Sequence, residues 1–168
     1  MRRALKFRLW MQTDATPPSP PVFEGYVLEH YRKLERMYAA APINAWFAPV
    51  LKVGNGEAEI QLPLRKDFHH SAGAVHGSLY FKALDDATFF AANSLVQGTF
   101  VLTAHFEIDL LRPVVLGNLI ARAKVTGEDE RRIYAQGELF DEEGALLARG
   151  KGDFARSKIP LTPKVHYF

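Results

Sequence analysis

Residues 77–95 form the segment that most restricts how this chain can fold. At helical spacing, apolar side chains cover nearly its whole circumference, so a helix here must be wrapped by other elements to be stable in water. The helix is predicted to begin at Gly77 or Ser78, with Ser78 as its N-cap, and to be about 27 Å long. Its apolar residues are Leu79, Tyr80, Phe81, Ala83, Leu84, Ala87, Phe89, Phe90, Ala91 and Ala92.

Strand patterns lie on both sides of this helix in the sequence. Before it, residues 46–53 and 58–62 flank a Gly-Asn-Gly turn and predict a hairpin. After it, alternation of apolar and polar residues predicts strands over residues 102–110, 119–126, 132–140 and 145–156. Strands that follow one another without an intervening helix pair antiparallel. The sequence therefore predicts an α+β fold in which an antiparallel sheet wraps one long helix.

The strand over residues 102–110 is predicted to have one core face and one polar face. The core face is expected to hold Leu102, Ala104, Phe106, Ile108 and Leu110. The residues between them are Thr103, His105, Glu107 and Asp109, which are polar and point the other way in an extended strand.

The N-terminal part of the chain divides into a tail and a helix. Residues 16–21 contain four prolines, which favour an extended linker, so residues 1–22 are predicted to be a flexible tail. Apolar residues at helical spacing predict an amphipathic helix over residues 24–41. Residues 23–168 are then one domain.

Composition excludes several classes of function. The 168 residues include no cysteine, which excludes disulfides, thiolate nucleophiles and cysteine-ligated metals and fits a cytoplasmic protein. The formal charge of +2 is too small to imply a nucleic-acid partner, and no apolar stretch is long enough for a membrane span. We expect no cofactor. The pair His69 and His70 lacks further ligands at metal spacing, so no metal is expected either.

Two adjacent aspartates on the apolar helix have different neighbours. Asp86 has Lys82 one turn before it, with Asn93 on the same stripe two turns later, which predicts a structural ion pair. Asp85 lies between Phe81 and Phe89, one turn away on either side. This apolar bracket should desolvate the carboxylate and raise the pKa of Asp85, so Asp85 is the candidate for chemistry.

The turn that enters the helix, residues 73–78, is built of small residues and His76. Free backbone N–H groups at a helix start can stabilise a developing oxyanion. Asp85 lies nine residues beyond His76 and about 12 Å along the helix from its start, which is too far to serve an oxyanion site of its own chain. A two-fold dimer with antiparallel central helices could bring the two features together.

The order of these short motifs resembles one known family. The residues that carry the resemblance are Gly73 to Ser78, Leu84 to Asp86, Thr103, Leu111 to Pro113, Gly117 and Ala148 to Phe154. Over about residues 45–156 the chain is similar to hotdog-fold acyl-CoA thioesterases of the phenylacetate-pathway type. The resemblance implies a hotdog fold and a homodimer or dimer of dimers, with each active site between two protomers.

The resemblance also implies roles for individual residues. Asp85 is expected to be the general base or the nucleophile, the Gly77 amide to polarise the thioester carbonyl and His76 to shape the turn. His70 occupies a position where the family often has Asn or Gln, and it is a candidate carbonyl-polarising group. Further contacts to the substrate are expected from Ser78, Phe81, Phe89, Thr103 and Arg112, with Arg112 a candidate for a coenzyme A phosphate.

The leading hypothesis is hydrolysis of an acyl-CoA thioester. Hydratase chemistry is an alternative, but the proline-rich His motif that resembles those enzymes is absent. A non-catalytic acyl-CoA-binding or regulatory module and a purely structural dimer remain open, and the presence of Asp85 favours the enzyme.

Overall fold

The computed structural model describes residues 21–168, with side chains from Val27 onward. The predicted tail therefore lies outside the described residues except for Pro21 and Val22, which begin the first helix. No helix in the described range is long and apolar enough to cross a membrane.

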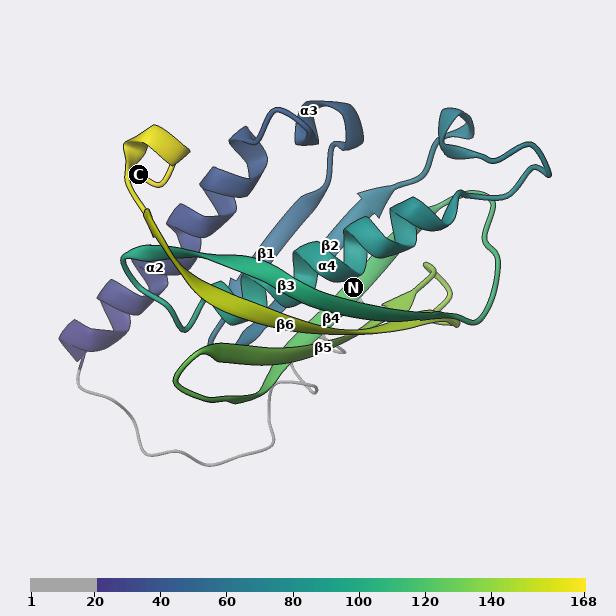
Figure 1. The fold of residues 1–168 in the computed structure, drawn as a ribbon. Coiled ribbons are helices and arrows are strands. Elements are labelled where there is room, and N and C mark those ends of the chain that lie inside the picture. The colour runs from purple at the N-terminus through teal and green to yellow at the C-terminus, as the bar shows by residue number, and fades with distance from the viewer. Residues whose placement is uncertain (1–20) are drawn as a thin grey trace.

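The core of the fold is helix α4 (Gly77–Asn93), held against one face of a six-stranded antiparallel sheet (Figure 1). The strand order is β1-β2-β4-β5-β6-β3, and α4 packs against all six strands. The strands are β1 (Val50–Gly54), β2 (Glu57–Pro63), β3 (Thr99–Leu110), β4 (Asn118–Glu128), β5 (Arg132–Phe140) and β6 (Leu146–Pro160). The predicted α+β architecture, a long helix wrapped by an antiparallel sheet, is confirmed.

Helix α2 (Pro21–Ala40) packs against β1 and contacts α4 through individual side chains. Its Tyr38 ring meets Phe90 of α4 edge-on, with 5.0 Å between ring centroids. Its buried His30 links α4 to the C-terminal segment, because one ring nitrogen is 3.1 Å from the Asn93 carbonyl and the other is 2.7 Å from the Tyr167 hydroxyl. The remaining short helices are α3 (Asn44–Phe47), η1 (Lys66–Phe68) and η2 (Pro163–Val165).

Three local predictions are wrong. Trp46 and Phe47 were expected to begin a strand, but they end the short helix α3, and the strand begins at Val50. The N-cap of α4 is His76 rather than Ser78, because the His76 side chain accepts the Ser78 N–H. The predicted core face of β3 is not a core face: Leu102 and Leu110 are 45% and 58% exposed, whereas Val101 is buried.

Strand β3 departs from the predicted alternation of buried and exposed side chains for two reasons. Its pairing with β6 shifts register between Thr103 and His105, so the inward face changes parity within the strand. It is also the last strand of the sheet, hydrogen-bonded to β6 on one side only. Phe106 and Ile108, beyond the shift, are partly buried.

Close packing of the sheet depends on a glycine in β6. A Cβ at Gly152 would lie 2.6 Å from the Phe154 ring, which is fully buried, and 3.0 Å from Phe106. We expect Gly152→Ala to destabilise the fold by about 1–3 kcal/mol, because the buried ring cannot yield without repacking. Gly127→Ala in β4 is the matched control, since nothing lies within 4 Å of its Cβ position. Urea unfolding measures both, and equal midpoints would contradict the prediction.

Candidate active site

Asp85 lies on the face of α4 that looks toward β3. One carboxylate oxygen accepts a hydrogen bond of 3.0 Å from the Thr103 hydroxyl on that strand. Burial raises the pKa of Asp85 from 3.8 to about 6, against the lowering effect of the Thr103 hydrogen bond. The charge of Asp86 raises it further, and Lys82 lowers it. The predicted desolvated carboxylate is therefore present, and near neutral pH it can accept a proton.

Asp86 is the structural carboxylate of the pair. One of its oxygens accepts both the Tyr38 hydroxyl and the Lys82 ammonium, each at 2.6 Å. The predicted ion pair with Lys82 is confirmed. The side-chain amide of Asn93, which lies two turns further along α4, bonds to the backbone at Val96, Thr99 and Val101 and fixes the start of β3.

The two aspartates border a cavity of about 300 Å³. Helix α4 supplies one wall, β3 another, and the segment from α2 to α3 the third. The lining residues are Met37, Tyr38, Ala41, Ile43, Asn44, Lys82, Asp85, Asp86, Phe89, Phe90, Phe100, Leu102 and Thr103. Of the predicted substrate contacts, Phe89 and Thr103 line this cavity. Phe81 does not; it lies against Phe106 with ring centroids 5.3 Å apart and is partly exposed.

The start of α4 presents a backbone N–H group. Nδ1 of His76 accepts the Ser78 N–H at 3.1 Å and lies 2.8 Å from the Ser78 hydroxyl. The N–H of Gly77 has no acceptor within residues 21–168, and it lies at the positive end of a helix of 17 residues. Leu110 lies 3.3 Å from the position that a Gly77 Cβ would occupy, so the apolar end of β3 covers this turn.

The structure does not bring His70 or Arg112 to the Asp85 cavity. His70 is exposed in the loop before α4, where its Nδ1 accepts the Ala72 N–H at 3.1 Å. His69 contacts the Val115 carbonyl at 2.8 Å. Arg112 is exposed at the end of β3, and its carbonyl accepts the Tyr80 hydroxyl at 3.1 Å. His69 and the Arg112 carbonyl thus connect the segment after β3 to the start of α4, whereas the His70 bond stays within its own loop.

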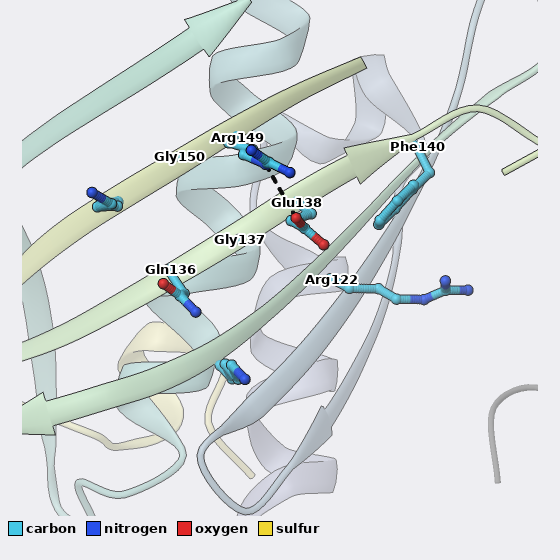
Figure 2. A pocket seen from close by; sticks show the side chains of 9 residues that line it. Arg122, Gln136, Gly137, Glu138, Phe140, Arg149 and Gly150 are labelled. Carbon is cyan, nitrogen blue, oxygen red and sulfur yellow. Dashed lines mark hydrogen bonds and ion pairs between the residues drawn. The ribbon is translucent and has the colours of Figure 1, made fainter. Parts of the chain in front are cut away.

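A second depression, of about 500 Å³, lies on the opposite face of the sheet (Figure 2). Figure 2 shows Glu138 and Arg149 on neighbouring strands, joined by an ion pair at 3.2 Å. Arg122 on β4 is likewise paired with Glu59, at 2.8 Å, and Lys151 with Glu107. Charges of opposite sign thus alternate across the strands, which is typical of a solvated sheet face.

Sequence reasoning missed the part of the cavity that comes from residues 37–44. These residues lie more than 40 positions before Asp85, and no local pattern places them near it. The only available signal was the polar Asn44 within a largely apolar stretch.

The raised pKa makes Asp85 a destabilising group at neutral pH. Its folded pKa of about 6 exceeds the ordinary 3.8, so stability falls as the pH rises through this interval. We expect Asp85→Asn to stabilise the protein by about 1–3 kcal/mol at pH 7.5, and by about half as much at pH 5. Urea unfolding at the two pH values measures this gain. A loss of stability at pH 7.5 would contradict the assignment.

Comparison with known proteins gives a consistent result. Residues 72–148 match the family model described as the thioesterase superfamily. The Escherichia coli PaaI protein of the phenylacetic acid degradation operon superposes with a TM-score of 0.74 at 20% identity, covering 81% of this chain and 99% of that chain. A thioesterase family protein of Silicibacter pomeroyi gives a TM-score of 0.70 at 21% identity, covering 76% and 97%.

A curated relative from Saccharolobus solfataricus that carries the name of an esterase is 25% identical over 112 residues. That alignment covers 66% of this chain and 80% of the relative. The predicted hotdog fold and the predicted resemblance to thioesterases are confirmed.

Proposed function

Residues 72–148 of this chain belong to the thioesterase superfamily of hydrolases, and we propose that its substrate is an acyl-CoA thioester. Asp85 acts as general base or nucleophile, and the Gly77 amide of the partner subunit donates to the oxyanion. The observation that carries the proposal is the carboxylate of Asp85, with a pKa of about 6, on the wall of a cavity of about 300 Å³.

The chemistry needs one proton acceptor and one oxyanion donor. At neutral pH Asp85 is largely ionised, so it can take a proton from water or attack the thioester carbonyl itself. The tetrahedral oxyanion that forms is stabilised by a backbone N–H at the start of α4. Collapse of this intermediate breaks the carbon–sulfur bond and releases coenzyme A as a thiolate, which then takes up a proton. If Asp85 has activated water, its carboxylic acid returns that proton and the other product is the free acid. If Asp85 has attacked the carbonyl itself, a mixed anhydride remains on Asp85, and water hydrolyses it to the free acid and the restored carboxylate. Phe89 and Thr103 border the acyl group, and Arg112 is proposed to meet a coenzyme A phosphate.

Two protomers are needed for this site. Asp85 and Gly77 are eight residues apart on one helix, about 12 Å along its axis, so they cannot act on the same carbonyl within one chain. Strand β3 is 12 residues long and lies at the edge of the sheet with Leu102 and Leu110 exposed, which favours pairing with a second copy. Antiparallel pairing of β3 would set the two α4 helices antiparallel and place Asp85 of one protomer opposite Gly77 of the partner subunit.

The direct test is thiol release from a panel of aromatic, short-chain and long-chain acyl-CoAs. Release from any of them supports hydrolysis, and the preferred ester gives the substrate class. Binding of these esters without release, measured by calorimetry, would replace the proposal with a non-catalytic acyl-CoA-binding module.

The role of Thr103 gives a second test, through the pH profile. Thr103→Val removes the hydrogen bond that lowers the pKa of Asp85, so this pKa should rise above about 6. We expect the acid limb of kcat/KM to move to higher pH by about half a unit to one unit. Thr126→Val on β4, whose hydroxyl bonds to the Tyr134 carbonyl, is the matched control. A midpoint that stays in place or moves lower would contradict the role of Thr103.

A further inference from the structure

Two contacts fix how helix α4 lies along the edge strand β3. The Asp85 carboxylate accepts the Thr103 hydroxyl at 3.0 Å. Nearer the start of the helix, Leu110 lies 3.3 Å from the Cβ position of Gly77. The proposed site joins Asp85 to Gly77 of the partner subunit. Antiparallel pairing of two β3 strands meets this need when Thr103 lies opposite Leu110 of the partner subunit.

A β-bulge at Ala104 makes this pairing possible. Residues opposite one another in an antiparallel pair point to the same face of the sheet, but Thr103 and Leu110 would point to opposite faces of a regular strand. The pairing with β6 advances by one residue where β3 advances from Thr103 to His105, so Ala104 is an extra residue. Beyond the bulge the alternation is reversed. Thr103 and Leu110 therefore both face α4, as their contacts with the helix show.

Counting inward from both ends of the paired segment, with Ala104 left out, places the two-fold axis at Glu107. The resulting pairs are Thr103 with the partner's Leu110, His105 with the partner's Asp109, Phe106 with the partner's Ile108 and Glu107 with the partner's Glu107. On the face toward the helix, two partly buried apolar side chains meet. On the outer face, a histidine meets a carboxylate. Both kinds of cross-strand pair are favourable.

Helix α4 gives a second position for the axis. Antiparallel helices bring Asp85 level with Gly77 of the partner subunit only if the axis passes the residue midway between the two, which is Phe81. Gly77, Phe81 and Asp85 follow one another at intervals of four residues and share one helix face. The Phe81 ring lies 5.3 Å from the Phe106 ring, next to Glu107, and it is 44% exposed. Strand and helix thus place the axis at the same point.

We propose that two copies of this chain pair through β3 about an axis at Glu107, with Phe81 of each copy packed at the axis beneath the strands. The bulge at Ala104 sets this register. A shift of the axis by one residue would move the partner strand by two residues, about 7 Å, and would separate Asp85 from Gly77 of the partner subunit. The inference rests on the proposed function, because it takes these two groups as one site.

The like charges of Glu107 and the partner's Glu107 at the axis are compatible with this register. The Glu107 carboxylate is 3.4 Å from the Lys151 ammonium on β6 of its own chain, so each carboxylate reaches the axis with a cation beside it. Both side chains are more than half exposed, so solvent and salt screen the repulsion that remains.

The chain contains no cysteine, so single cysteine variants report the register directly. Glu107→Cys is expected to form a disulfide-linked dimer on mild oxidation, because the Cβ atoms of directly opposite residues lie about 4.5–5.5 Å apart. Asp109→Cys is the matched control. It is exposed on the same face of β3, but its own copy would lie about 13 Å away along the strand. Non-reducing gel electrophoresis should show at least about tenfold more linked dimer for Glu107→Cys.

A mixed pair gives a second test of the register. His105→Cys and Asp109→Cys, co-expressed, are expected to link to each other, although neither links to its own copy. The inference is overturned if Glu107→Cys does not link, if Asp109→Cys links to its own copy as readily, or if the wild type sediments as a monomer. Thiol release from acyl-CoAs would still support the proposed hydrolysis in those cases. Linkage at Glu107 in a protein that hydrolyses no ester of the panel would support the register and contradict the proposed function.

Discussion

Asp85→Asn is expected to lower kcat/KM for acyl-CoA hydrolysis by at least about a hundredfold, the smallest loss typical of removing a general base. The amide keeps the shape of the side chain but can neither accept a proton nor attack a carbonyl. The same substitution is expected to stabilise the fold, because it removes a desolvated charge. Loss of activity together with a gain in stability is hard to explain by misfolding. Thiol release and urea unfolding on the same preparation measure the two effects.

The neighbouring carboxylate is the control for this experiment. Asp86→Asn removes an equal charge one residue away, but Asp86 is bonded to Tyr38 and Lys82 rather than directed at a substrate. We expect the Asp86→Asn variant to lose less than about tenfold in kcat/KM and to be less stable than the wild type.

In the wild type, kcat/KM should fall tenfold per pH unit below about pH 6, since protonated Asp85 is inactive. Equal losses of kcat/KM in Asp85→Asn and Asp86→Asn, or a kcat/KM that does not fall below about pH 6, would contradict the catalytic role of Asp85.

The parts of this fold that could be predicted from sequence are those set by local periodicity. The helix over residues 77–93 and the strand over residues 132–140 follow from side chains three to four or two positions apart. The contrast between Asp85 and Asp86 was also readable, because their decisive neighbours lie one turn away on the same helix. The desolvation of Asp85 and the ion pair of Asp86 could therefore be predicted without knowledge of the tertiary structure.

The features that were missed depend on contacts distant in sequence. The exposure of Leu102 follows from a register shift against β6 and from the edge position of β3, which the alternation of β3 alone does not encode. Residues 37–44 reach the cavity because the end of α2 contacts α4, where the Tyr38 ring meets Phe90 and the Tyr38 hydroxyl bonds to Asp86. The cap of α4 was assigned to Ser78 because its hydroxyl is a common N-cap, but the neighbouring His76 ring accepts the free N–H instead.

Gly77→Pro is expected to lower kcat/KM by about a hundredfold to a thousandfold, as loss of an oxyanion donor does. Proline has no backbone N–H, yet it is well tolerated at the first position of a helix. The extended conformation of His76 also suits the residue before a proline. Gly77→Ala is the matched control: it adds the same Cβ beside Leu110 but keeps the N–H. If Gly77→Ala loses as much as Gly77→Pro, the loss is steric and the oxyanion role is wrong.

Co-expression of the Gly77→Pro and Asp85→Asn variants then tests whether the site is shared between protomers. In a dimer of one chain of each kind, one site combines an intact Asp85 with an intact Gly77, and the other site has neither. Random pairing makes half of the dimers mixed, so co-expression should restore about a quarter of wild-type activity although each variant alone is nearly inactive. A site contained within one protomer gives no restoration, because every chain carries one defect. Recovery of activity would therefore require Asp85 and the Gly77 amide to come from different copies of α4, as the 12 Å between them on one helix implies.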